Sequence, residues 1–189
     1  KQLKNHLRAV FLYSLATAKT TQISDGLSDA QYAAFEPGGK HLFFTASNNV
    51  GLSNAWLDMS SLDHSTTSSA YVVVLSKDDP SPLAPESDEE KVAEAKKDEK
   101  PAEKKDDKSA GKNDEKSKDL RIDLDGIDQR ILALPVPPRN YIATSSPKAG
   151  MLLLMEDPTP FFNNAPPSYI VHKFDFKTRK TEKVTEGVQ

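Results

Sequence analysis

The sequence predicts an all-β fold, a β-propeller segment of about two and a half four-stranded blades with a disordered charged insertion. Three observations lead to this prediction. Short runs of β-forming residues alternate with turns rich in Gly, Pro and Asp. A unit of two strands and a turn occurs twice, and one long stretch nearly lacks large apolar side chains. A chain of 189 residues is long enough for one modest domain with an apolar core.

The strand-forming runs in the first half of the chain are short and are bounded by turn residues. They lie at Val10–Leu15, Thr20–Ser24, Tyr32–Phe35, His41–Ala46 and Ala70–Leu75. The turn Glu36–Lys40 contains Pro-Gly-Gly, which is typical of a tight hairpin. Because Ala70–Leu75 is almost wholly apolar, we expect both of its faces to be covered.

The second half continues the pattern. Leu120–Leu124 alternates apolar and polar residues before the turn signal Asp125-Gly126. This alternation predicts a strand that begins at Leu120 and pairs with the strand ending at Leu75. The remaining expected strands are Ile127–Val136, Tyr141–Thr144 paired with Met151–Met155, and Tyr169–Phe176 paired with Thr181–Thr185. No helix is expected outside the insertion.

The chain also repeats itself. Tyr13–Gly26 aligns with Phe174–Gly187 without a gap, and an aromatic residue, a Thr, a Lys, a β-branched residue and a Gly recur in step. A second unit, strand, Gly/Pro turn and strand, occurs at Tyr32–Ala46 and Tyr141–Met155. One unit of each kind supplies the four strands of a propeller blade. The chain is therefore expected to open with the outer half of one blade, followed by two complete blades.

The first complete blade is interrupted by a charged insertion. Between Glu86 and Asp119 nearly every residue is Lys, Asp, Glu, Ala or Ser, and Val92 is the only large apolar side chain. So little apolar surface does not offset the entropy of ordering the chain, which predicts a disordered surface loop, with a docking or spacing role as the alternative. The expected division is 1–76, half a blade and the start of the split blade; 77–119, the insertion; and 120–189, the remainder of the split blade and a further blade.

Charge and composition argue against several classes of function. The net charge is −3 and the lysines of the insertion are matched by acidic residues, so no basic surface for nucleic acid is expected. The absence of Cys excludes disulfides and thiolate metal sites. No apolar run approaches the ~20 residues of a membrane span, so no membrane partner is expected. Because the chain lacks an initiator Met, we expect it to begin inside a longer polypeptide.

Two groups of residues resemble a known family. Val10–Gly26 and Phe35–Thr45 are similar to the blade repeat shared by tricorn-type peptidases and TolB-like propellers. The order that follows is more specific: Tyr71–Leu75, then Asp79–Pro82, a charged insertion, and Ile122–Pro135. This order resembles the matching part of bacterial tricorn-like serine peptidases, and the resemblance covers nearly the whole chain.

The resemblance implies a non-catalytic propeller segment of a serine peptidase that degrades oligopeptides, with a role in substrate access and scaffolding. In this family the propellers precede a PDZ-like module and a catalytic domain. The implied partners are peptide substrates, flanking blades, a downstream peptidase domain and further copies of the protein in a homo-oligomer. The family slightly favours the cytoplasm over the periplasm. Two rivals remain, a TolB-like protein-binding propeller and the propeller of a prolyl-oligopeptidase-type enzyme.

A serine peptidase needs a His to accept the proton of its nucleophile. The four candidates are His6, His41, His64 and His172. His41 and His172 lie within predicted strands, where we expect ordinary half-exposed positions, and His64 lies beside Asp63 in a polar loop. The sequence contains no Gly-x-Ser-x-Gly elbow. We therefore predict no catalytic residue and no cofactor-binding residue in this chain.

Three acidic residues, Asp123, Asp125 and Asp128, surround Gly126 and suggest a calcium loop. The EF-hand pattern fails because its first ligand position is Arg121 and its twelfth is Leu132. We instead expect a β-turn centred on Asp125-Gly126, with Arg130 paired with a nearby Asp. No metal site is predicted.

Aromatic residues in two loops are candidates for ligand binding. Phe161 and Phe162 are adjacent in a Pro-rich loop, and Trp56 lies in the long link between two strands of the split blade. Propellers and other scaffolds often carry binding residues on loops. The alternative is that these side chains pack under their own blade.

Overall fold

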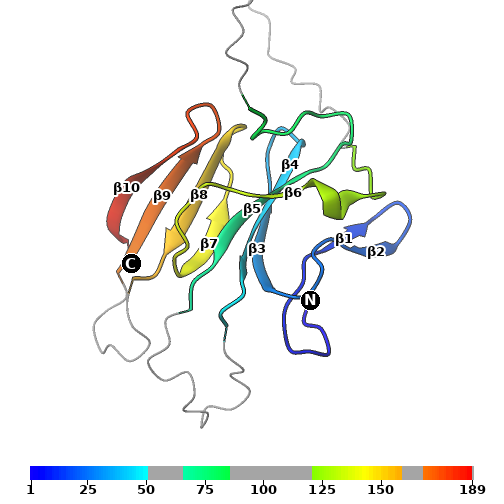
Figure 1. Cartoon of the computed structure of the whole chain (residues 1–189), viewed down its shortest axis with the longest axis horizontal. Helices are drawn as coiled ribbons and strands as arrows, with labels where there is room; N and C mark the ends of the chain where they lie inside the picture. The colour runs from blue at the N-terminus through cyan, green and yellow to red at the C-terminus, as the bar shows by residue number, and fades with distance from the viewer. Residues whose placement is uncertain (51–65, 86–120, 159–167, 189) are drawn as a thin grey trace, which may run out of the picture.

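The structure is a computed structural model that describes residues 1–50, 66–85, 121–158 and 168–188. Two four-stranded antiparallel sheets lie side by side, and a two-stranded hairpin packs against the outer side of the first sheet (Figure 1). Within the described residues, no helix is long and apolar enough to cross a membrane.

The elements follow one another in the order expected for consecutive blades. They are β1 (Phe11–Ser14), β2 (Lys19–Gln22), β3 (Asp29–Phe35), β4 (His41–Ser47), β5 (Ser69–Val74), the 3₁₀ helix η2 (Ile127–Arg130), β6 (Ile131–Ala133), β7 (Tyr141–Ser145), β8 (Met151–Glu156), β9 (Tyr169–Asp175) and β10 (Lys180–Val188).

Each sheet is a meander in which neighbours in sequence are neighbours in space. The orders are β1-β2, then β3-β4-β5-β6, then β7-β8-β9-β10, and the pairs are antiparallel. The hairpin β1–β2 is half a blade, β3–β6 is the first blade and β7–β10 is the second blade. The predicted fold class, an all-β propeller segment, is therefore confirmed.

The first blade is buried on both faces because it lies between the half blade and the second blade. Along β4, Leu42 and Phe44 contribute to a core shared with the half blade. Phe43 points the other way, into a core shared with the second blade that includes Leu154 and Phe174. This alternation explains why β4 is buried almost throughout.

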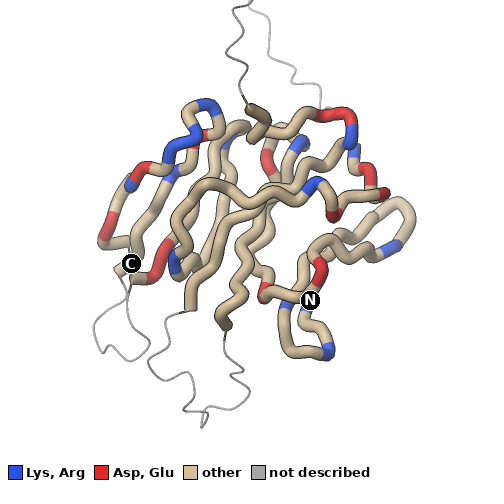
Figure 2. Tube along the Cα trace, viewed as in Figure 1, with Lys and Arg blue, Asp and Glu red and all other residues tan. Residues whose placement is uncertain are grey.

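β5 confirms the expectation drawn from its unbroken apolar sequence. Ala70 and Val72 contribute to the core shared with the second blade, whereas Val73 contributes to the core shared with the half blade. All three side chains are fully enclosed. Charged residues, in contrast, are concentrated in the turns and along the outer strands of the second blade (Figure 2).

The expected strand Ile127–Val136 is wrong at both ends. Gly126 adopts a left-handed conformation with φ of 63°, and the chain then makes the 3₁₀ turn η2. Only Ile131–Ala133 forms a strand, β6. The turn places Ile127 in the core shared by the half blade and the first blade, a position that the expected strand did not predict.

The expected strand beginning at Leu120 is also not present in the described residues, which resume at Arg121. Residues 121–124 have no strand geometry. β5 instead pairs with β6, and Asp123 makes a single backbone hydrogen bond to Leu75, 3.0 Å between N and O. Most of the insertion lies outside the described residues, so the division 1–76, 77–119 and 120–189 stays a prediction.

Candidate functional site at the joint between the complete blades

The joint between the two complete blades carries a Glu–His pair at each end of its apolar core. The first pair is Glu36 with His41 and the second is Glu156 with His172. His41 lies on the same face of β4 as Phe43, and His172 lies on the same face of β9 as Phe174. Four buried or nearly buried titratable groups in one joint make it the strongest candidate site among the described residues.

The hairpin turn between β3 and β4 positions the first pair. Gly39, with φ of 69°, closes the turn, and its N–H donates to the carbonyl of Glu36 at 2.9 Å. Glu36, the residue after β3, therefore lies opposite His41, the first residue of β4, and its N–H donates to the His41 carbonyl at 2.9 Å. A Pro-Gly-Gly turn of this kind was expected from the sequence.

The Glu36 carboxylate connects the two blades. Its Oε2 accepts a hydrogen bond from Nδ1 of His41 at 2.8 Å, and its Oε1 accepts one from the N–H of Gly150, in the second blade, at 2.7 Å. The side chain is only 4% exposed. Burial raises the pKa of Glu36, but the hydrogen bonds from His41 and Gly150 outweigh burial and hold the pKa below its usual value.

The His41 ring also packs across the joint. It stacks on Phe176, which follows β9, with ring centroids 6.1 Å apart and an interplanar angle of 1°. Phe43 and Phe176 pack at 5.5 Å. The imidazole is therefore held by a carboxylate on one side and by aromatic rings from both blades on the other.

The second pair lies at the opposite end of the core. Nε2 of His172 is 2.6 Å from Oε2 of Glu156, and Arg139 donates to both carboxylate oxygens at 3.1 and 3.2 Å. Tyr141 contacts the His172 ring edge-on at 6.4 Å and donates its hydroxyl to the carbonyl of Pro137 at 2.7 Å. Burial raises the pKa of Tyr141 to about 12, so it acts as a neutral donor here.

This arrangement ties the two blades together through hydrogen bonds and ring contacts. A catalytic imidazole needs a hydroxyl or thiol within hydrogen-bonding distance to deprotonate. Among the described residues, the rings of His41 and His172 are paired with Glu36 and Glu156, and each ring also contacts an aromatic side chain. The expectation of half-exposed positions is wrong for His172, which is 7% exposed because it faces the preceding blade.

The remaining histidine candidate in the described region does not join this cluster. His6 lies in the exposed turn before β1 with φ of 65°. His64 and its neighbour Asp63 lie outside the described residues, as do Trp56, Phe161 and Phe162. The predictions for those five residues stay predictions.

The acidic loop around Gly126 is organised by hydrogen bonds within the protein. The Asp123 carboxylate accepts the N–H of Lys77 at 3.0 Å and forms an ion pair with Arg121 at 3.2 Å. Arg130 does bond to a nearby Asp, as expected, but it donates to the backbone carbonyl of Asp123, and Arg121 forms the ion pair with the Asp123 carboxylate. The described residues contain no cluster of three or more side chains suited to a metal ion.

A third polar contact, which the sequence interpretation missed, joins the half blade to the first blade. Arg8 and Asp29 form a two-pronged ion pair, with Nε to Oδ1 at 3.0 Å and Nη2 to Oδ2 at 2.6 Å. Burial raises the pKa of Asp29, but the hydrogen bonds from Arg8 outweigh burial and lower it. The available signal was an Asp at the start of a strand, which local patterns do not distinguish from a turn residue.

The sequence matches no protein-family model and no curated protein. Among solved structures, the chain is similar to one described as the crystal structure of the tricorn protease, with a TM-score of 0.59 and 19% identity. The fold is tricorn-like. The similarity covers 95% of this chain and 15% of that chain, so the tricorn-like region is a small part of the solved protein.

Proposed function

We propose that these residues form a non-catalytic propeller segment of a tricorn-like serine peptidase that degrades oligopeptides. Their role is to hold flanking blades in a ring and to control the access of peptides to a peptidase domain elsewhere in the polypeptide. The tricorn-like succession of half blade, first blade and second blade over 95% of the chain carries this proposal.

The chemistry of the joint is consistent with a scaffold. Glu36 and Glu156 direct their carboxylates to hydrogen bonds that tie strands and blades together, and Arg8 with Asp29 does the same at the other joint. Removing one member of such a buried pair destabilises a fold because it leaves an uncompensated polar group. These residues therefore support a static frame.

Peptide hydrolysis tests the proposal. Two proteins are assayed with fluorogenic oligopeptides, some with proline and some without. One is the 189-residue chain, and the other is the natural polypeptide that contains it, here called the full-length protein. We expect no turnover by the chain and turnover of both peptide types by the full-length protein, abolished by a serine-directed phosphonate inhibitor. The variants His41→Gln and His172→Gln of the 189-residue chain serve as controls for the two buried pairs.

Each other outcome points to a different function. No turnover by the full-length protein favours the TolB-like binding propeller. Cleavage confined to proline-containing peptides favours the prolyl-oligopeptidase type. Turnover by the 189-residue chain that disappears in His41→Gln or His172→Gln contradicts the scaffold role and makes the joint a catalytic site.

A further inference from the structure

The segment that follows β5 crosses from the first blade toward the second. Residues 77–85, here called the crossing segment, leave the end of β5 and run over the joint between the two complete blades (Figure 1). The sequence predicted a solvated loop from residue 77 onward. The crossing segment nevertheless contributes Leu83, which packs against the core shared by the two blades. It is therefore in contact with the fold before the chain reaches residue 86.

A β-turn shapes the end of the crossing segment. Ala84 donates its N–H to the carbonyl of Ser81 at 3.1 Å, and Leu83 donates its N–H to the hydroxyl oxygen of Ser81 at 3.2 Å. Ser at the first position of a β-turn and Pro, here Pro82, at the second are both favoured. This turn fixes the backbone on both sides of Leu83.

The first blade holds the start of the crossing segment beside the other end of the insertion. Lys77 donates its N–H to the carboxylate of Asp123 at 3.0 Å, and Asp78 forms an ion pair with Arg121 at 2.7 Å. The N–H of Asp123 donates in turn to the carbonyl of Leu75 at 3.0 Å. The chain that returns from the insertion is thus attached to the first blade.

The second blade holds the end of the crossing segment. Leu83 and Phe176, which follows β9, both pack against the core that contains Phe43 of the first blade. Arg179, in the turn between β9 and β10, donates its Nη2 to the carbonyl of Ala84. The crossing segment therefore starts on one blade and ends in contact with the other.

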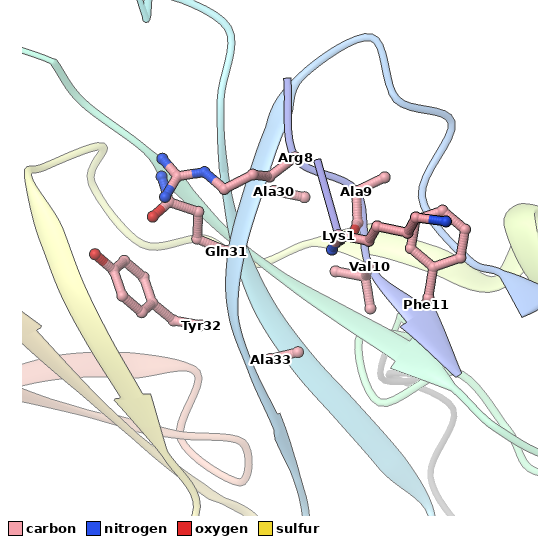
Figure 3. A pocket seen from close by; sticks show the side chains of 9 residues that line it. All are labelled: Lys1, Arg8, Ala9, Val10, Phe11, Ala30, Gln31, Tyr32 and Ala33. Carbon is pink, nitrogen blue, oxygen red and sulfur yellow. Dashed lines mark hydrogen bonds between the residues drawn. The ribbon is translucent and has the colours of Figure 1, made fainter. Parts of the chain in front are cut away.

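The joint that this segment crosses is bounded on both sides by complete blades. The joint of the half blade differs, because a groove of about 400 Å³ lies there between Val10 and Ala30, with the first residue, Lys1, in its wall (Figure 3). Any residue that precedes Lys1 borders that groove. The contacts of the crossing segment, in contrast, are made between residues of the two complete blades.

We propose that the crossing segment is a releasable fastening that holds the second blade against the first at the Glu36 end of their joint. Asp79 of this segment lies 3.7 Å from Lys40, in the same turn as Glu36. When the segment is released, that end of the joint opens while the rest of the shared core stays closed. Because the insertion continues from residue 85, the segment connects the insertion to the joint. The inference rests on these contacts and does not depend on the peptidase function.

Amide hydrogen exchange in the full-length protein tests this proposal with Leu83→Ala. The matched control is Leu124→Ala, at the other end of the insertion, where the side chain is 44% exposed. The reporters are the amide of Gly150, which donates to Glu36 across the joint, and the amide of Leu154, deep in the shared core. We expect Leu83→Ala to accelerate exchange at least about tenfold more at Gly150 than at Leu154, and the control to change both by less than about threefold.

Two results of this comparison overturn the proposal. Equal acceleration at Gly150 and Leu154 shows that Leu83 supports the whole core and fastens no particular end of the joint. An effect of Leu83→Ala no larger than that of Leu124→Ala shows that the crossing segment does not hold the joint closed.

A second pair of variants tests the attachment to the second blade. Arg179→Gln removes the guanidinium that donates to Ala84, whereas Lys177→Gln removes a positive charge from the same turn and leaves that hydrogen bond in place. We expect Arg179→Gln to accelerate exchange of the Ala84 and Gly150 amides at least about threefold more than Lys177→Gln does. Equal exchange in the two variants overturns the proposal, whatever the peptidase assay shows.

Discussion

Truncation of Phe43 to Ala is expected to loosen both complete blades at once. The Phe43 side chain is 0% exposed and packs in the core of the joint with Leu154, Phe174 and Phe176. Replacing a fully buried Phe with Ala costs about 3–5 kcal/mol, through lost burial and the cavity that remains. Because every 1.4 kcal/mol is a factor of ten, we expect hydrogen exchange to accelerate about 100- to 4000-fold.

The assay is hydrogen exchange with mass spectrometry on the full-length protein, comparing peptides that cover β4 with peptides that cover β9. Exchange measures the free energy of local opening, and both strands contribute to the same core. The matched control is Phe35→Ala, on the paired strand of the same hairpin. Phe35 is 46% exposed and pairs with Leu42, so its truncation is expected to cost about 1 kcal/mol.

Two results would refute this reasoning. If Phe43→Ala accelerates exchange in β4 and leaves β9 unchanged, the two blades do not share a cooperative core. If Phe35→Ala is as destabilising as Phe43→Ala, burial at the joint does not determine the stability of this hairpin.

Two further predictions concern acid and the insertion. The pKa of Glu36 is lowered from 4.5 in the fold, so its contribution to stability is complete above pH 4.5 and is lost as the pH falls through the lower, folded pKa. Between about pH 6 and about pH 3, the melting temperature of Glu36→Gln should therefore fall less than that of the wild type. Parallel curves for the two proteins would contradict this role of Glu36. Replacing Glu86–Lys118 with a short Gly/Ser linker should leave the melting temperature unchanged within about 2 °C, because the free-energy cost of closing a loop changes by only about 0.6 kcal/mol per doubling of its length. A protease should cut the unaltered chain first within Lys91–Lys118. Early cuts elsewhere would show that the insertion is docked.

The sequence predicted the hairpins of the second blade well because their signals are local. The turn around Pro147 separates two runs of β-formers, and the structure pairs Thr144 with Leu154 as a short hairpin requires. The repeat between Tyr13–Gly26 and Phe174–Gly187 also predicted the four-stranded blade, since a repeated sequence implies a repeated packing environment.

Long-range contacts could not be predicted in the same way. Glu36 was predicted only as a turn residue, because its partner Gly150 is far along the chain and belongs to another blade. His172 looked half-exposed in an alternating strand, and its burial depends on the blade that packs over it. Ile127 was placed in a strand because β-branched side chains are common in strands, although they also occur in buried turns. The left-handed conformation of Gly126 redirects the chain, but it is only one of several conformations that glycine can adopt, so the sequence did not predict it.

The central claim is that these residues are an incomplete propeller whose outer faces require further blades. The half blade exposes Tyr13 and Leu15 by 59% and 90%, although the aligned Phe174 is 0% exposed beneath its neighbouring blade. At the other end, Leu153 of β8 is half-buried on the second blade's free face, whereas the corresponding Phe43 of the first blade is fully covered. Exposed apolar faces of this kind favour association between molecules.

Light scattering combined with thermal melting tests this claim most directly, on the 189-residue chain and on the same chain extended by its natural flanking sequence. We expect the 189-residue chain to be oligomeric, aggregated or only partly folded, and the extended chain to be monodisperse with a sharper, higher melt. A 189-residue chain that is a monodisperse monomer with a sharp cooperative melt would show that these residues close their own core, and would contradict the incomplete-propeller account.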